Sequence, residues 1–157
     1  MVPARTPHPP PAPQDHVRAL AALPVFSDLD EAERSEIAAA SRSRAVAAGR
    51  CTYRRGEEAE ALYVVLAGRM EVVKMDAAGG ERRLGELGPG DLFGEAGLLE
   101  DRPHTSEVRA AEPSEVLLVP RPVLDRLFER HPARRLRLRT LSVTRRLAKV
   151  SAAFRGE

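Results

Sequence analysis

One stretch of the chain combines glycines, a carboxylate and hydroxyl side chains at a spacing that could bind a small ligand. Gly94 and Gly97 enclose Glu95, and glycine lets the backbone approach a ligand closely and adopt positive φ. Residues 95–100 are long enough for about one helical turn, whose free amides suit an anion such as a phosphate. Glu95 has the wrong sign for a phosphate, so we interpret it as an acceptor for hydroxyls, with a sugar 2′-hydroxyl as its natural partner.

The residues that follow could complete such a site. Thr105 and Ser106 add hydroxyl groups and their own amides, and Arg102 or His104 would supply a cation. The same pattern is also compatible with a glycine-rich turn and a short helix that bind nothing. The stretch 91–110 therefore raises the hypothesis of a site for a phosphorylated sugar without establishing it.

The overall composition indicates one domain with an uneven charge distribution. The chain has 157 residues and a net charge of +2, a length that suits one domain with a sizeable core. Eleven basic and three acidic residues lie from Arg121 onward, so this segment carries +8 and residues 1–120 carry −6. The basic pI therefore describes the C-terminal segment more than the domain.

Several classes of function lack the residues they need. Cys51 is the only cysteine, which excludes an internal disulfide and a cysteine metal site. No nucleophile stands beside a histidine in a catalytic pattern, so we predict that the protein is not an enzyme and needs no cofactor. The four histidines show no metal-ligand spacing: His8, His16, His104 and His131. No signal peptide or apolar span of about 18 residues is present, which predicts a soluble, cytoplasmic protein without membrane contact.

The chain divides into three parts by pattern. Residues 1–16 are rich in proline and are predicted to be a disordered tail. Residues 17–132 should form the folded body, beginning with a short helical segment that Pro24 interrupts and a helix over 29–40 capped by Ser27 or Asp28. Residues 133–157 are predicted to form a basic helix.

From Ser43 onward the hydrophobic period changes to two, with glycines between short runs. The run 61–68 predicts a well-buried strand, and 69–75 is its expected partner. Residues 76–80 should form a hairpin loop before the returning strand 81–87, and two more strands are expected at 106–111 and 115–121. The spacing predicts a mainly β fold with flanking helices, an antiparallel roll or barrel of jelly-roll type.

The C-terminal segment has two apolar strips. The helix expected over 121–131 should end at Pro132. The helix after it carries a coiled-coil-like seam made by Leu136, Thr140, Val143, Leu147, Val150 and Phe154. Leu138, Leu141 and Ala148 lie beside that seam. This width predicts contact with the chain's own body and with a partner helix, as a homodimer through 133–154, while packing on the domain alone is the alternative.

The basic residues of the same helix leave other partners open. They could contact nucleic-acid phosphates without specificity, form a solvated face, or meet an acidic protein partner. No second, DNA-reading domain follows the helix, so we do not expect sequence-specific DNA binding.

At this point a family resemblance becomes visible. Phe93-Gly94-Glu95, the apolar run 96–99 and the segment 103–106 resemble the phosphate-binding cassette of the cyclic-nucleotide-binding domain family. This family is best known from catabolite activator proteins, regulatory subunits of cyclic-AMP-dependent kinase and cyclic-nucleotide-gated channels. The resemblance covers about residues 25–150 and implies a β-roll with an N-terminal helix and two C-terminal helices.

The resemblance also implies roles for single residues. Glu95 would bind the ribose 2′-hydroxyl, the backbone around Gly94 and Gly97 would meet the sugar or phosphate, and Thr105 and Ser106 would meet the phosphate or base. The helix after Pro132 would close over the base. The complete set of expected ligand-binding residues is Phe93, Gly94, Glu95, Ala96, Gly97, Leu98, Arg102, His104, Thr105 and Ser106.

One residue departs from the family pattern. His104 stands where the family has its phosphate-pairing arginine. Histidine is mostly neutral at pH 7 and lacks the planar fork that grips a phosphate. Two hypotheses follow: a regulatory sensor of cAMP or cGMP that signals through its C-terminal helix, or a degenerate domain that binds no cyclic mononucleotide and serves as a structural or protein-interaction module.

Overall fold

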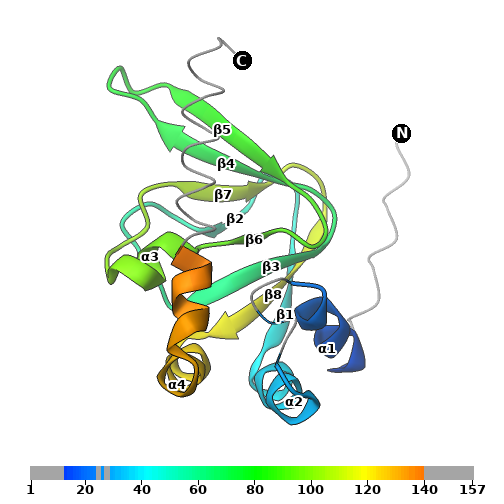
Figure 1. Cartoon of the computed structure of the whole chain (residues 1–157). Helices are drawn as coiled ribbons and strands as arrows, with labels where there is room; N and C mark the ends of the chain where they lie inside the picture. The colour runs from blue at the N-terminus through cyan, green and yellow to red at the C-terminus, as the bar shows by residue number, and fades with distance from the viewer. Residues whose placement is uncertain (1–12, 24–25, 27–28, 140–157) are drawn as a thin grey trace, which may run out of the picture.

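The computed structural model describes residues 13–23, 26 and 29–139. The tail before residue 13 and the seam positions from Thr140 onward lie outside the described residues. In the described part of the chain, eight strands form two four-stranded sheets, and the helices gather over the outer face of one of them (Figure 1). None of the helices in the described ranges is long and apolar enough to cross a membrane.

The two sheets are antiparallel throughout. The first has the order β1-β8-β3-β6 and the second the order β2-β7-β4-β5. The first contains β1 (Arg42–Val46), β8 (Ser114–Pro120), β3 (Ala61–Ala67) and β6 (Leu92–Phe93). The second contains β2 (Cys51–Tyr53), β7 (Glu107–Ala110), β4 (Met70–Met75) and β5 (Glu81–Leu87). The predicted antiparallel roll is confirmed.

One predicted strand pairing is wrong. Residues 69–75, as β4, were expected to pair with β3, but β3 pairs with β8 and β6 while β4 pairs with β5 and β7. The cause is the turn at Gly68, which has φ 88°. A β-carbon there would lie 2.3 Å from Ser114 Oγ, so the backbone passes close to the start of β8 and crosses into the second sheet. The predicted β4–β5 hairpin is correct.

The N-terminal helices also differ in detail from the expectation. α1 (Pro13–Ala21) begins at Pro13, so residues 13–16 are helical and not part of a disordered tail; proline suits the first helical position because no hydrogen bond is needed there. α2 (Glu31–Ala40) is capped by Asp30, whose Oδ1 accepts from Glu33 N at 2.7 Å, and not by Ser27 or Asp28.

Two cores hold the roll together. A helix-side core joins α1, α2, α4 (Arg121–Arg130) and the helical residues 132–139 to the first sheet, with Leu62, Leu117 and Leu138 fully buried. An inter-sheet core fills the space between the sheets and contains Tyr53, Tyr63 and Phe93. α3 (Glu95–Glu100) follows shortly after β6. The segment that contains Glu95 and Gly97 therefore begins at the edge of the inter-sheet core.

Candidate functional site

The expected site residues surround one cavity. A pocket of about 330 Å³ lies between the second sheet and the segment 91–106. Nine of the ten expected residues line it: Phe93, Gly94, Glu95, Ala96, Gly97, Arg102, His104, Thr105 and Ser106. The structure therefore brings together residues that the sequence spreads over 14 positions.

The backbone at the start of α3 places Glu95 at the pocket. Gly94 has φ 83°, and a β-carbon on it would lie 3.0 Å from the ring of Tyr63. The Phe93 ring stacks on Tyr63 with centroids 5.0 Å apart, which fixes the residue before the turn. Glu95 is consequently a buried carboxylate, 7% exposed, at the pocket wall. A buried acceptor of this kind suits a hydroxyl donor on a ligand.

Gly97 is required by close packing. A β-carbon there would lie 2.7 Å from Ala59 Cβ and 2.9 Å from the carbonyl oxygen of Arg102. Arg102 N donates to the carbonyl oxygen of Gly97 at 3.1 Å, so the segment after α3 folds back on the helix. Asp101, at φ 49°, makes the reversal. This return brings residues 102–106 to the same pocket as Glu95.

His104 is a buried neutral side chain. Its ring lies flat on Tyr53, with centroids 3.5 Å apart and planes inclined by 7°. Its backbone is bound on both sides, because His104 N donates to Glu57 O at 3.0 Å and its carbonyl oxygen accepts from Gly56 N at 2.9 Å. Burial lowers the pKa of His104, and the opposing effect of Glu57 is smaller. His104 therefore lines the pocket without bringing a positive charge at neutral pH.

This burial predicts a pH dependence of stability. The unfolded chain takes up a proton on His104 near the ordinary pKa of about 6.5, whereas the folded chain does so only at lower pH. The free energy of unfolding should therefore fall as the pH decreases through this window, by at most about 1.4 kcal/mol per pH unit for one proton. Urea denaturation at pH 7.5, 6.5 and 5.5 should show a flatter profile for His104→Gln than for the wild type. Identical profiles would contradict the assignment.

Arg102 is the one arginine or lysine among the described residues that line the pocket. Its Nη2 lies 2.5 Å from Glu100 Oε2, and its side chain is 47% exposed. Two other acidic side chains of the wall have protein partners: Asp91 Oδ2 accepts from Gly88 N at 2.8 Å, and Glu86 pairs with Arg69 at 2.7 Å.

The floor of the pocket comes from residues that the sequence-based prediction missed. Val72 pairs with Gly85 on one side and with Val108 on the other, which forms a row across β5, β4 and β7. The missed lining residues are Tyr53, Val72, Gly85, Glu86, Leu87, Asp91, Pro103 and Val108. The two-residue period of β4 and β7 could have indicated the valines, because it places them on the inner face. Nothing local indicates Tyr53, whose raised pKa reflects its burial and keeps it neutral.

Leu98 lies on the other side of α3. It is not among the residues lining the pocket and packs, with Leu99, against the helix-side core. Arg135 in the helical segment 132–139 donates from Nη2 to Leu99 O at 2.7 Å. Another cavity, of about 230 Å³, lies among α3, α4 and Arg135. Figure 1 shows α3 directly beside this C-terminal segment.

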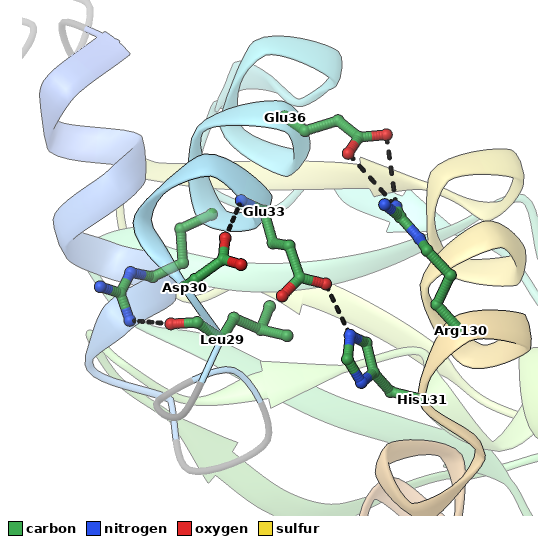
Figure 2. A network of polar contacts seen from close by, with 7 residues as sticks. Leu29, Asp30, Glu33, Glu36, Arg130 and His131 are labelled. Atoms are coloured by element: carbon green, nitrogen blue, oxygen red, sulfur yellow. Dashed lines mark hydrogen bonds and ion pairs between the residues drawn. The ribbon is translucent and has the colours of Figure 1, made fainter.

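Two polar contacts tie α2 to the junction between α4 and residues 132–139 (Figure 2). His131 Nε2 lies 2.6 Å from Glu33 Oε2, and Arg130 Nη2 lies 3.2 Å from Glu36 Oε2. His131 follows the last residue of α4, so the contacts fix the point where the chain turns into its next helix.

Within the described residues, no group of three histidine, cysteine or acidic side chains could hold a metal ion.

Comparison with known proteins agrees with this geometry. Residues 43–131 match the family model described as cyclic nucleotide-binding domain. A cAMP-dependent protein kinase regulatory subunit of Blastocladiella emersonii is 40% identical over 88 residues, which are 56% of this chain and 22% of that protein. The chain thus spans about a fifth of that relative.

Solved structures show the same fold. The regulatory domain of Toxoplasma gondii PKA with cAMP aligns with a TM-score of 0.67 and 28% identity, covering 72% of this chain and 43% of that one. The catabolite activator protein of Thermus thermophilus aligns with a TM-score of 0.69 and 28% identity, covering 83% and 61%. The family model matches more than half of the chain and includes all the residues that line the pocket. The chain therefore belongs to the cyclic nucleotide-binding domain family.

Proposed function

We propose that this domain senses a cyclic nucleotide of the cAMP or cGMP type and signals through its C-terminal helix. The observation that carries the proposal is the position of α3 between the pocket and that helix. Glu95, Ala96 and Gly97 line the pocket. Leu98 and Leu99 pack against the core on the other side, where Leu99 O accepts from Arg135. A ligand that moves α3 therefore changes a contact of the segment 132–139.

The pocket residues suit the parts of such a ligand. The buried carboxylate of Glu95 would accept from the ribose 2′-hydroxyl, as the family resemblance implies. Thr105 and Ser106 also line the pocket and have hydroxyl groups for the phosphate or the base. The related Toxoplasma gondii domain contains cAMP, which supports this class of ligand.

The helices around α3 provide a means of transmission. The cavity among α3, α4 and Arg135 leaves space for a different packing of these elements. Glu33 and Glu36 hold the α4 junction on one side, so a shift of residues 132–139 would pivot near His131. Ligand binding would favour one of the two arrangements only by the difference in its affinity for them.

The output would be a helix surface presented to a partner. Leu138 is fully buried, whereas Leu136 on the same helical segment is 64% exposed. An exposed leucine beside a docked face fits the predicted seam, of which Leu136 is the described member. A second copy of this chain is the partner that the seam favours, with an acidic protein as the alternative that its basic residues would support.

A hydrogen-exchange experiment tests the proposal. Saturating cAMP should change the amide exchange rate of residues 132–139 by several fold, and also that of α3, while the central strands β3 and β8 stay unchanged. The same experiment on Glu95→Gln should show a smaller response at a cAMP concentration that just saturates the wild type. Binding without any response at 132–139 would contradict signalling through that helix.

The second hypothesis, a degenerate domain, has one observation in its favour. His104 is neutral and stacked on Tyr53 at the position where the family has its arginine. Calorimetric titration with cAMP and cGMP separates the two hypotheses: saturable binding that requires Glu95 supports the sensor, and no binding at millimolar ligand supports a structural or protein-interaction module.

A further inference from the structure

The pocket has a carboxylate for the sugar but needs a cation for the phosphate. We propose that Arg102 is the residue that pairs with the phosphate of the bound cyclic nucleotide, and that Glu100 holds it at the pocket rim when the ligand is absent. The inference rests on the proposed function, since it assigns a residue to the phosphate of that ligand. Among the described lining residues, only Arg102 carries a permanent positive charge.

His104 is held in a position unsuited to this role. Its ring is stacked on Tyr53 and 6% exposed, and its backbone is tied to Gly56 and Glu57. A charged imidazolium at this position would lose its hydration. Among the described residues, no carboxylate lies at hydrogen-bond distance from the ring to compensate for that loss. His104 therefore acts as a structural side chain that packs the wall of the pocket.

Arg102 is anchored to the element that carries the sugar-binding group. Its N–H donates to Gly97 O at 3.1 Å, and a β-carbon on Gly97 would lie 2.9 Å from the carbonyl oxygen of Arg102. The backbone of Arg102 is thus fixed to α3 at Gly97, two residues after Glu95. The segment 95–102 therefore carries both the hydroxyl acceptor and the cation.

The Glu100 contact is of a kind that a phosphate can replace. The Arg102 and Glu100 side chains are 47% and 29% exposed, and exposed ion pairs contribute little to stability. A phosphate offers arginine two parallel charge-assisted hydrogen bonds. Glu100 therefore competes with the ligand phosphate for Arg102, and this competition lowers the affinity for the ligand. When the ligand binds, Arg102 exchanges Glu100 for the phosphate.

The test is a set of titrations on the full chain with cAMP, and with adenosine as the uncharged comparison. Arg102→Gln should weaken cAMP binding about tenfold or more, the effect of losing a charge-assisted pair, and leave adenosine binding within twofold. Glu100→Gln should strengthen cAMP binding several fold, and this gain should disappear in the double variant Glu100→Gln/Arg102→Gln. Arg82→Gln removes an exposed arginine outside the pocket lining and is the matched control, expected to match the wild type.

The outcomes separate this inference from the proposed function. If cAMP binds and Glu95→Gln abolishes binding, but Arg102→Gln binds as the wild type does, Arg102 is not the phosphate partner and the sensor function stands. The inference would also be overturned if Glu100→Gln raised the cAMP affinity equally in the wild type and in the Arg102→Gln background. Failure of the wild type to bind cAMP overturns both. Circular dichroism of Arg102→Gln checks that the variant folds, and Arg102→Lys, which keeps the charge but not the fork, should give an intermediate affinity.

Discussion

Glu95→Ala is expected to weaken cAMP binding by about ten- to hundredfold. The carboxylate is buried at the pocket wall, and a hydrogen bond to a charged group contributes about 1.5–3 kcal/mol. Calorimetric titration of the wild type and the variant measures the loss. Because the side chain lies inside the pocket, its removal should affect affinity more than the folding of the distant strands.

A modified ligand makes this prediction specific. cAMP that lacks the 2′-hydroxyl should bind the wild type as weakly as ordinary cAMP binds Glu95→Ala. The variant itself should distinguish the two ligands by less than twofold, because the partner of the hydroxyl is gone. An additive loss, in which the variant still prefers the hydroxyl, would show that Glu95 acts on the pocket's shape and not on the sugar.

The second large effect is expected at the C-terminal helix. Leu138 is fully buried in the helix-side core, and leucine-to-alanine changes at such positions cost about 2–5 kcal/mol. Leu138→Ala should therefore release the segment 132–139 from the body, seen as faster amide exchange there and a lower midpoint in urea. The ligand-induced change at 132–139 should also be lost, since the helix is no longer docked.

Leu136→Ala is the matched control for this change. It makes the same substitution in the same helical segment at a position that is 64% exposed, so the expected loss in a monomer is within about 0.5 kcal/mol. If it proves as destabilising as Leu138→Ala in dilute solution, the division of this helix into a docked and an exposed face is wrong. A loss that grows with protein concentration would instead report on the predicted homodimer.

Much of the fold could be predicted from local pattern. The run 61–68 has apolar residues on both faces, which is typical of a strand buried between two layers, and β3 is such a strand. The short helix at 95–100 and the hairpin at 76–80 follow from glycine and aspartate positions, with Asp76 Oδ1 accepting from Ala78 N and Gly80 N.

The wrong strand pairing shows where local pattern fails. Adjacent strands in the sequence usually pair, but β3 and β4 lie in different sheets because Gly68 packs against Ser114, 46 residues later. Such contacts between residues far apart in the sequence decide which strands pair. The two-residue hydrophobic period of a strand carries no information about them. The capping residue of α2 is a similar case, since Asp28 and Asp30 have the same chemistry and only the start of the helix selects one.

The motif residues of the candidate site could be predicted from the sequence, but their arrangement in space could not. Motif residues 93–97 and 102–106 do line one pocket. Leu98 packs against the helix-side core and not in the pocket. It follows Glu95 by three residues, a spacing that the helical period places on the same face, so the sequence contains no signal of this separation. The stacking of His104 on Tyr53 joins residues 51 positions apart, so no local signal could have shown that this histidine is buried.

The position of β8 in the first sheet determines at what point of its synthesis the chain can fold and form the pocket. β8 lies between β1 and β3 and pairs with both, although it comes last among the strands of the described residues. In the same way β7 joins β2 to β4. Long-range pairings of this kind form late and slowly. A nascent chain on the ribosome therefore exposes unpaired β edges until residue 120 has emerged, and truncated fragments should aggregate without ever forming the pocket.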